Sequence, residues 1–186
     1  LGHTEGRPLP GWPVVAPPVE APPPLGPLLF VHHKPTYEYG YAPEREAVFA
    51  DFHERYRDDS LVLDKWFALQ AASQRPDTIE VVEQLARHAD FTIKNPNRWR
   101  ALVSHFAANQ WAFHHASGRG YRFLADMILE VDRINPQVPA RQVPSLGRWR
   151  RFEAGRAELM RAELERVVKT PGLSKDVFEQ ASKSLG

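Results

Sequence analysis

Proline is distributed very unevenly along this chain, and no other feature restricts the fold as strongly. Eleven of the 17 prolines lie at or before Pro43, many of them in the run APPVEAPPPLGPLL at residues 16–29. Proline fixes φ and has no backbone N–H, so this density excludes helix interiors and central strands. We therefore predict a Pro-rich, irregular and poorly ordered tail over residues 1–42, and a folded domain over residues 43–186.

Aromatic residues concentrate at the end of this tail. The segment FVHHKPTYEYGY contains Val31, Tyr37, Tyr39 and Tyr41. These side chains have enough apolar surface to dock on the domain, but docking would cost chain entropy. The sequence leaves docking and solvation open.

Composition excludes several classes of function. The chain has 24 Lys and Arg against 23 Asp and Glu, so overall charge predicts neither a nucleic-acid nor a membrane-surface partner. It has no cysteine, which excludes disulfides and thiolate sites and fits a reducing compartment. No apolar run approaches the roughly 20 residues of a membrane span, and no signal-peptide pattern is present. We expect a cytoplasmic protein, and the initial Leu1 suggests that its natural amino terminus lies further upstream.

From Glu44 onward, apolar residues recur at intervals of three and four, which is typical of amphipathic helices. The predicted helical segments are PEREAVFADFHERYRDD (43–59), SLVLDKWFALQAASQ (60–74), PDTIEVVEQLARHA (76–89), one that begins at NPNRWR (95–100), YRFLADMILEVDRIN (121–135), LGRWRRFEAGRAELMRAELERVVK (146–169) and a short one after Ser174. No strand-period segment of useful length interrupts them. We predict an all-α fold of antiparallel helix pairs stacked as an α-α superhelix of the ARM or HEAT type, although no repeat of fixed period is visible.

Helix starts and apolar faces give further expectations. Ser60 is the expected cap of the second helix, and Asp77 with Glu80 forms the pattern of a capping box before the third. The residues expected to form apolar stripes are Ala47, Val48, Phe52, Arg55 and Tyr56, then Leu61, Trp66, Leu69 and Ala72, then Val81, Val82, Leu85 and Ala86, then Trp99, Leu102, Val103 and Phe106.

NPNRWR is an unusual helix start. Asn95 can accept an orphan backbone N–H, and Pro96 has no N–H to lose at the first helical position. The next residues place two arginines in the first turn, where the helix macrodipole disfavours cations. Those arginines therefore need a specific explanation.

Catalytic and metal-binding motifs are missing. HERYR supplies His53 and Glu54, but Arg57 stands where the zinc motif H-E-x-x-H needs its second histidine. The neighbouring pairs His32–His33 and His114–His115 point about 100° apart on a helix, so neither pair can hold one ion from a single face. There is no G-x-S-x-G, Walker loop or dinucleotide fingerprint. We therefore expect no catalytic residue and no metal ligand in this chain.

A basic run between Arg141 and Arg166 is the one candidate for a nucleic-acid surface. Glutamates interleave with its arginines at spacings of three and four, as on a solvated helix with internal ion pairs. We therefore expect paired surface charges and no nucleic-acid partner.

Four strings form an ordered set, namely LVLDKWFALQA (61–71), FTIKNPNRWRALV (91–103), INPQVPAR (134–141) and LSKDVFEQASKSL (173–185). With these strings, the chain from about residue 43 to its end resembles the carboxy-terminal domain of bacterial aminopeptidase N, a family of zinc-dependent gluzincin exopeptidases. Residues 1–42 do not share the resemblance, and we attribute them to a frameshift or gene break.

The resemblance implies a non-catalytic role for this chain. In that family an upstream catalytic domain supplies the H-E-x-x-H zinc site and the G-A-M-E-N element, and this sequence contains neither. The carboxy-terminal domain is a superhelix that closes over the active site and encloses a cavity through which peptides enter. The implied partners are that catalytic domain and the peptide substrate. Zinc is expected only in the parent enzyme, and this chain alone should be inactive.

Two arginines are the candidate substrate-binding residues by the same resemblance. They are Arg100, the last residue of NPNRWR, and Arg141, the last residue of INPQVPAR. A guanidinium can pair with a peptide carboxylate in a bidentate geometry. The alternative is structural pairing with a nearby carboxylate, for which Asp64, Asp90 and Asp126 are candidates. The alternative for the whole chain is a free-standing helical scaffold that binds a protein partner.

Overall fold

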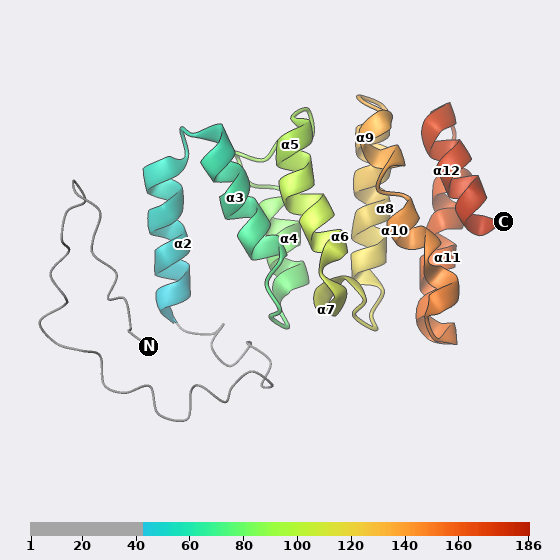
Figure 1. Ribbon diagram of the computed structural model, residues 1–186, viewed down its shortest axis with the longest axis horizontal. Coiled ribbons are helices and arrows are strands. Elements are labelled where there is room, and N and C mark those ends of the chain that lie inside the picture. The colour runs from blue at the N-terminus through green and yellow to red at the C-terminus, as the bar shows by residue number, and fades with distance from the viewer. Residues whose placement is uncertain (1–42) are drawn as a thin grey trace, which may run out of the picture. The chain divides into compact units, whose positions relative to one another are not determined.

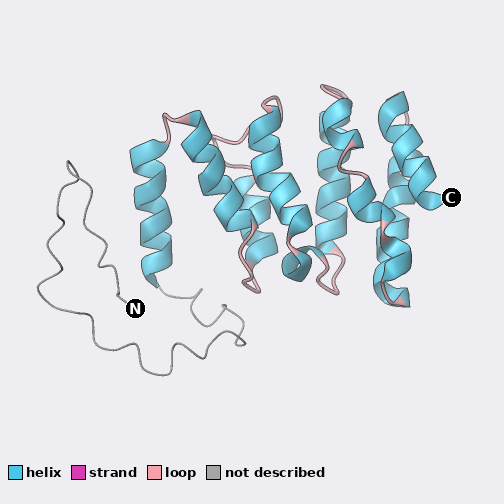
Figure 2. Cartoon of the chain, viewed as in Figure 1, coloured by secondary structure: helices cyan, strands magenta, loops and turns pink. Residues whose placement is uncertain are grey.

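A computed structural model describes residues 43–186 of the chain. The predicted tail over residues 1–42, including the docking of Val31 and the three tyrosines, lies outside the described residues. Within the described part, every regular element is helical and none is a strand (Figure 2). No helix in that part is long and apolar enough to cross a membrane.

The helices follow one another along the chain, with one longer loop over residues 86–95. They are α2 (Pro43–Tyr56), α3 (Ser60–Ala71), α4 (Thr78–Leu85), α5 (Pro96–Trp99), the π-helical η2 (Arg100–Ser104), α6 (His105–Ala108), α7 (Gln110–Phe113), α8 (Arg119–Asp132), α9 (Gln137–Ala140), α10 (Pro144–Gly147), the 3₁₀-helical η3 (Trp149–Arg151), α11 (Ala154–Val168) and α12 (Lys175–Leu185).

Most helices pack on the next helix in the chain, and the domain is a linear stack from α2 to α12 (Figure 1). α3 contacts α2, α4 and η2, while α8 contacts α4, α7 and α11. α11 in turn contacts α12. This arrangement confirms the predicted all-α stack.

The core is continuous along the stack. Its largest fully buried side chains come from successive layers and include Phe67, Trp99, Leu102, Phe106, Phe113, Tyr121, Leu124, Ile128, Met160 and Leu164. The apolar face predicted for the helix that starts at NPNRWR is confirmed, because Trp99, Leu102, Val103 and Phe106 are all buried.

Two of the predicted faces are only partly right. Trp66 of α3 is buried and Phe52 of α2 packs against the core as predicted, but other members of both faces are exposed. Leu61 and Leu69 are 72% and 58% exposed, because the buried stripe of α3 runs through Leu63, Trp66, Phe67, Gln70 and Ala71. At about 100° per residue, both leucines fall on the other side of that helix. On α2, Val48 is likewise 64% exposed and Tyr56 44% exposed, whereas Phe49 and Phe52 pack against the core.

Two helix starts also differ from expectation. Asp59, not Ser60, caps α3, and its carboxylate accepts from the N–H groups of Leu61 and Val62 at 3.0 and 3.2 Å. Asp77 occupies the N-cap position of α4 as predicted, but its side chain makes no capping hydrogen bond, because both of its oxygens accept from the Arg75 guanidinium at 2.7 and 2.6 Å.

The predicted helix over residues 146–169 is interrupted. α11 begins only at Ala154, and Phe152 before it has an extended backbone with φ −106° and ψ 161°. The Phe152 ring stacks on His114 with a centroid distance of 4.2 Å. This contact joins segments that are far apart in the sequence, and it keeps Phe152 outside a helix. Helical periodicity is a local pattern and does not reveal such a contact.

The NPNRWR helix begins as predicted. The Asn95 side chain accepts from the N–H groups of Asn97 and Arg98 at 2.9 and 3.3 Å, and Pro96 occupies the first helical position. The helix then widens into the π-helical segment η2, where the His105 N–H reaches back five residues to the Arg100 carbonyl.

Arg98 is the arginine of this motif that holds the fold together. It is only 5% exposed, and its Nε donates to the Asp64 carboxylate of α3. Its Nη1 donates to the backbone carbonyl of Asp90, and its guanidinium lies 5.1 Å from the centre of the Phe67 ring. The ion pair therefore joins α3, the loop before α5 and the start of α5.

We expect Asp64→Asn to destabilise the chain strongly, because the substitution leaves the Arg98 cation buried without its counter-ion. Breaking one side of a buried pair costs about 3–5 kcal/mol of unfolding free energy. Urea denaturation followed by circular dichroism measures the loss, with Asp58→Asn at an exposed carboxylate as the matched control. Equal unfolding midpoints for the two variants would contradict this role of Asp64.

Gly120 gives a second test of packing. A Cβ added there would lie 2.5 Å from the Phe113 carbonyl oxygen, where α8 meets α7, whereas one added at Gly155 of α11 would meet nothing within 4 Å. Gly120→Ala should therefore destabilise by about 1–3 kcal/mol, as other overpacking does. Gly155→Ala should stabilise by up to about 1 kcal/mol through helix propensity. Thermal unfolding of both variants checks the opposite signs, and two shifts of the same sign would refute the packing explanation.

Candidate functional site

Arg100 and Arg141 are brought to one place by the fold. Arg100 is exposed at the start of η2, and its Nη1 donates to the Asn97 side-chain oxygen at 2.8 Å. Arg141 is exposed directly after α9. Both line a small pocket of about 100 Å³, together with Pro96, Asn135, Gln137 and Val138. We call it the arginine pocket.

The carboxylates considered as structural partners of these arginines are engaged elsewhere. Asp64 pairs with Arg98, Asp90 lies 2.6 Å from His53, and Asp126 accepts from Arg166 at 2.7 Å. Across residues 43–186, no carboxylate lies within ion-pair distance of Arg100 or Arg141. The alternative interpretation, in which one of these three aspartates pairs with Arg100 or Arg141, is therefore wrong.

The basic run between Arg141 and Arg166 lies before and within α11. Arg156 pairs with Glu153 at 2.7 Å, Arg161 with Glu165 at 3.0 Å and Arg166 with Glu163 at 2.6 Å. The spacings are three and four residues, so the predicted internal ion pairs are confirmed. Much of the positive charge in this run is balanced locally.

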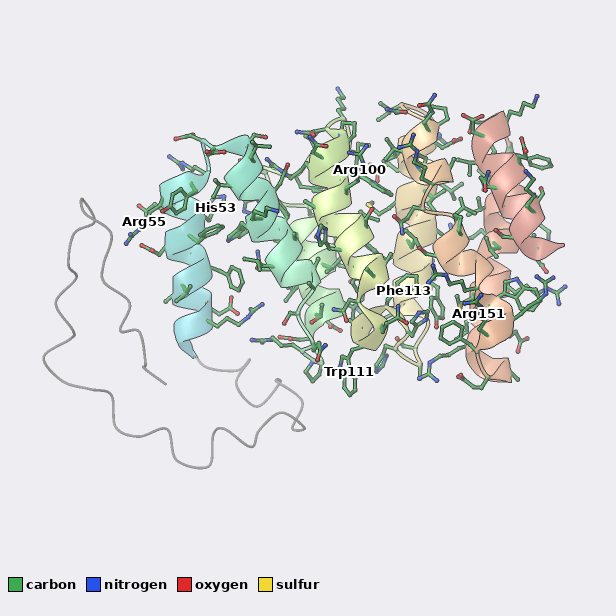
Figure 3. All side chains as sticks on the ribbon, in the orientation of Figure 1. His53, Arg55, Arg100, Trp111, Phe113 and Arg151 are labelled. Carbon is green, nitrogen blue, oxygen red and sulfur yellow. The ribbon has the colours of Figure 1, made fainter. Side chains whose placement is uncertain are left out.

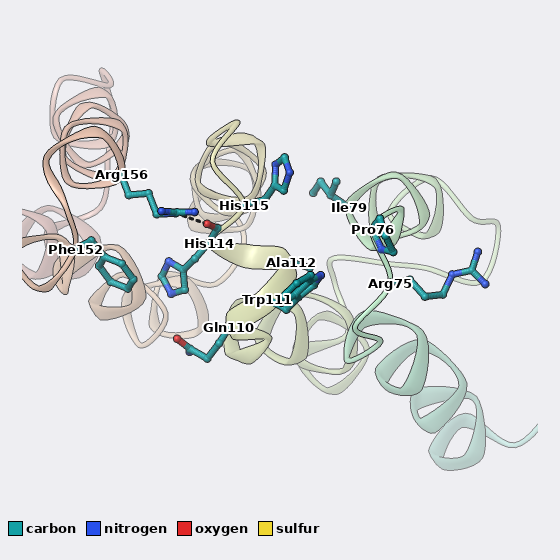
Figure 4. A pocket seen from close by; sticks show the side chains of 10 residues that line it. All are labelled: Arg75, Pro76, Ile79, Gln110, Trp111, Ala112, His114, His115, Phe152 and Arg156. Carbon is teal, nitrogen blue, oxygen red and sulfur yellow. Dashed lines mark hydrogen bonds between the residues drawn. The ribbon is translucent and has the colours of Figure 1, made fainter. Parts of the chain in front are cut away.

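A larger pocket of about 460 Å³ lies away from the arginine pocket (Figure 4). Its lining includes Trp111, which is 54% exposed, together with Ile79, His114, His115 and Arg156. Arg100 and Trp111 lie towards opposite edges of the stack (Figure 3). The larger pocket is therefore a separate feature. Sequence reasoning did not identify it because its walls come from α4, α7, α11 and the segments next to these helices.

His114 is held in place in the wall of this larger pocket. Its carbonyl oxygen accepts from the Nε of Arg156 at 2.6 Å (Figure 4), and its Nδ1 lies 3.0 Å from the Tyr121 hydroxyl. Burial lowers the pKa of His114, with a smaller contribution from the Arg156 charge. Burial also raises the pKa of Tyr121 to about 12. The two groups therefore form a neutral hydrogen-bonded pair at neutral pH.

Comparison with known proteins identifies the fold family. Residues 37–186 match the family described as "Domain of unknown function (DUF3458_C) ARM repeats". The match begins a few residues before the predicted boundary at residue 43. The ARM-repeat description confirms the predicted type of helical superhelix.

The curated relatives share one name. Aminopeptidase N of Caulobacter vibrioides is 52% identical over 153 residues, which are 82% of this chain and 18% of the relative. Aminopeptidase N of Haemophilus influenzae is 46% identical over 142 residues, or 76% of this chain and 16% of the relative.

A solved structure that resembles this chain is also that of an aminopeptidase. Aminopeptidase A of Legionella pneumophila, in complex with aspartic acid, superimposes with a TM-score of 0.73 at 33% identity, covering 76% of this chain and 17% of that chain. The chain thus spans less than a fifth of the length of the relatives that it matches. It belongs to the DUF3458_C family of ARM-repeat domains and corresponds to the carboxy-terminal helical domain of an aminopeptidase N.

Proposed function

We propose that this chain serves an aminopeptidase N that removes amino-terminal residues from peptides. In the whole enzyme it closes the active-site cavity and shapes the access of peptides, while Arg100 and Arg141 contact the substrate. Identity of 52% to one aminopeptidase N over most of the chain supports the parent activity. The arginine pocket supports the substrate contact.

The observation that carries the substrate contact is the convergence of two arginines on one pocket without an acidic partner among residues 43–186. Two guanidiniums that share a pocket repel each other, and an anion between them relieves that repulsion. A peptide carboxylate has the charge and the planar shape that a guanidinium binds with two parallel hydrogen bonds. The side chains of Asn135 and Gln137 add neutral polar groups to the same wall.

The proposal assigns the chemistry of hydrolysis to another part of the parent enzyme. HERYR has no second histidine for H-E-x-x-H, so a catalytic zinc ion would be held by the upstream catalytic domain, which is the proposed partner. This chain alone should release no amino acid from a peptide. The absence of cysteine fits a reducing compartment such as the cytoplasm, which we propose as its location.

The test uses the parent enzyme with Arg100→Ala or Arg141→Ala. A lost charged hydrogen bond is worth roughly 1.5–3 kcal/mol, so we expect kcat/KM for longer peptides to fall about ten- to a hundredfold. Small chromogenic amides of a single residue do not reach the pocket, and their hydrolysis should change little. Steady-state kinetics on both substrate classes measures the difference.

Arg57→Ala provides the matched control, because Arg57 is an exposed arginine just after α2 and does not line the arginine pocket. Melting temperatures of all three variants should equal that of the parent enzyme. Equal losses on peptides and small amides, together with a lower melting temperature, would show instead that the arginines are structural. A parent gene that encodes no H-E-x-x-H segment upstream would favour a free-standing scaffold.

A further inference from the structure

Three potential metal ligands meet between α2 and the loop that follows α4. His53 lies in the last turn of α2 (Figure 3), and His88 and Asp90 lie in the loop over residues 86–95. Their ligand atoms are all within 4.8 Å of one another. The three side chains are 22%, 33% and 36% exposed, so an ion in solution can reach them.

We propose that His53, His88 and Asp90 bind one divalent transition-metal ion of the zinc type, with water completing the coordination. Two imidazole nitrogens and one carboxylate oxygen form a ligand set that zinc accepts with an open fourth position. Calcium and magnesium prefer sites made only of oxygen atoms. The proposal does not depend on the peptidase function proposed above.

The distances around Asp90 are close to those of a ligand set. With metal bonds of about 2.0–2.1 Å, neighbouring ligand atoms of a tetrahedral site lie roughly 3.3 Å apart. The Asp90 Oδ2 lies 2.6 Å from Nε2 of His53 and 3.6 Å from Nδ1 of His88. Binding therefore requires the first distance to widen and the second to shorten, each by less than an ångström. The ligand atoms of His53 and His88, which lie within 4.8 Å of each other, must also approach a similar spacing. The metal ion would replace the proton that Nε2 of His53 donates to Asp90, leaving the other proton of that ring on Nδ1.

The surroundings hold both imidazoles towards the same carboxylate. The ring centres of His53 and His88 are 5.1 Å apart at an interplanar angle of 79°. The Trp66 ring lies against both of them, with centroid distances of 4.9 and 5.3 Å. Side chains fixed in this way lose little further entropy when they bind an ion.

Charge in the cluster also favours a cation. The hydrogen bond from His53 lowers the pKa of Asp90, so the carboxylate is ionised at neutral pH. Arg98 binds the Asp90 backbone carbonyl, and its charge is balanced by Asp64. The Asp90 carboxylate therefore supplies a negative charge that attracts a divalent ion.

The His53–Asp90 hydrogen bond engages the carboxylate, whereas His88 bonds only the backbone of Asp90. Nδ1 of His88 is 3.6 Å from the Asp90 carboxylate, which is too far for a hydrogen bond. It currently accepts the Asp90 backbone N–H at 3.2 Å, and a metal ion would compete for that lone pair. Occupation of the site would tie α2 to the loop that supplies the backbone acceptor of Arg98.

The experiment is a zinc titration of the full chain after a chelator and dialysis have removed metal. We expect one zinc ion to bind per chain, measured by competition with a chromophoric chelator, and the melting temperature to rise with zinc concentration. Cobalt(II) should give the visible absorption bands of a low-coordinate nitrogen and oxygen site. Magnesium and calcium should cause neither change.

Variants identify the ligands. His53→Gln and His88→Gln should each weaken zinc binding at least about tenfold, since even outer-sphere partners of metal sites contribute that much. The double variant His32→Gln/His33→Gln, which removes the adjacent histidines of the amino-terminal segment, should bind zinc as the unaltered chain does. Circular dichroism in the presence of the chelator establishes that each variant is folded.

Two results would overturn the proposal. One is the absence of saturable zinc binding by the unaltered chain. The other is zinc binding that persists in folded His53→Gln and His88→Gln but disappears in the His32→Gln/His33→Gln variant.

Discussion

The buried ion pair between Arg98 and Asp64 is the interaction on which the first half of the helical stack depends. It connects residues 34 positions apart in sequence, and the same guanidinium binds the backbone of the intervening loop at Asp90. A planar cation with several fixed donors can serve a carboxylate and a carbonyl at once, which lysine cannot do with the same geometry. The strings DKWF and NPNRWR therefore supply the two partners of one tertiary contact, Asp64 and Arg98.

Much of the helical layout could be predicted because it depends on local patterns. Spacings of three and four located the segments, and Asn95 with Pro96 fixed one helix start. The errors arose where a contact with another side chain, close by or distant in the sequence, decided the outcome. Asp77 fits a capping box by sequence, yet its carboxylate binds Arg75. Phe152 fits a continuous helix by periodicity, yet its ring stacks on His114 and the chain there is extended.

The candidate sites were likewise predicted in part from sequence strings and decided in part by contacts that those strings do not show. Family strings indicated Arg100 and Arg141, and the fold places both at the arginine pocket, but spacing alone could not show that their suspected partners serve Arg98, His53 and Arg166. Sequence analysis also set His53 aside because its own helix offers no second histidine. Its neighbours His88 and Asp90 come from another segment, and no local motif indicates that the two segments meet.

The π-helical segment η2 has a consequence for how the family can vary in length. A π turn contains about one residue more than the α-helical turn it replaces. A deletion of one residue here would therefore restore a regular helix and leave the later residues facing the same way, whereas a deletion within an α-helical stretch would rotate every later position by about 100°. Phe106, which is fully buried, would stay in the core, and Arg98 would stay in place. A change of one residue in length, which other parts of the stack accommodate in their loops, can here be accommodated inside a helix.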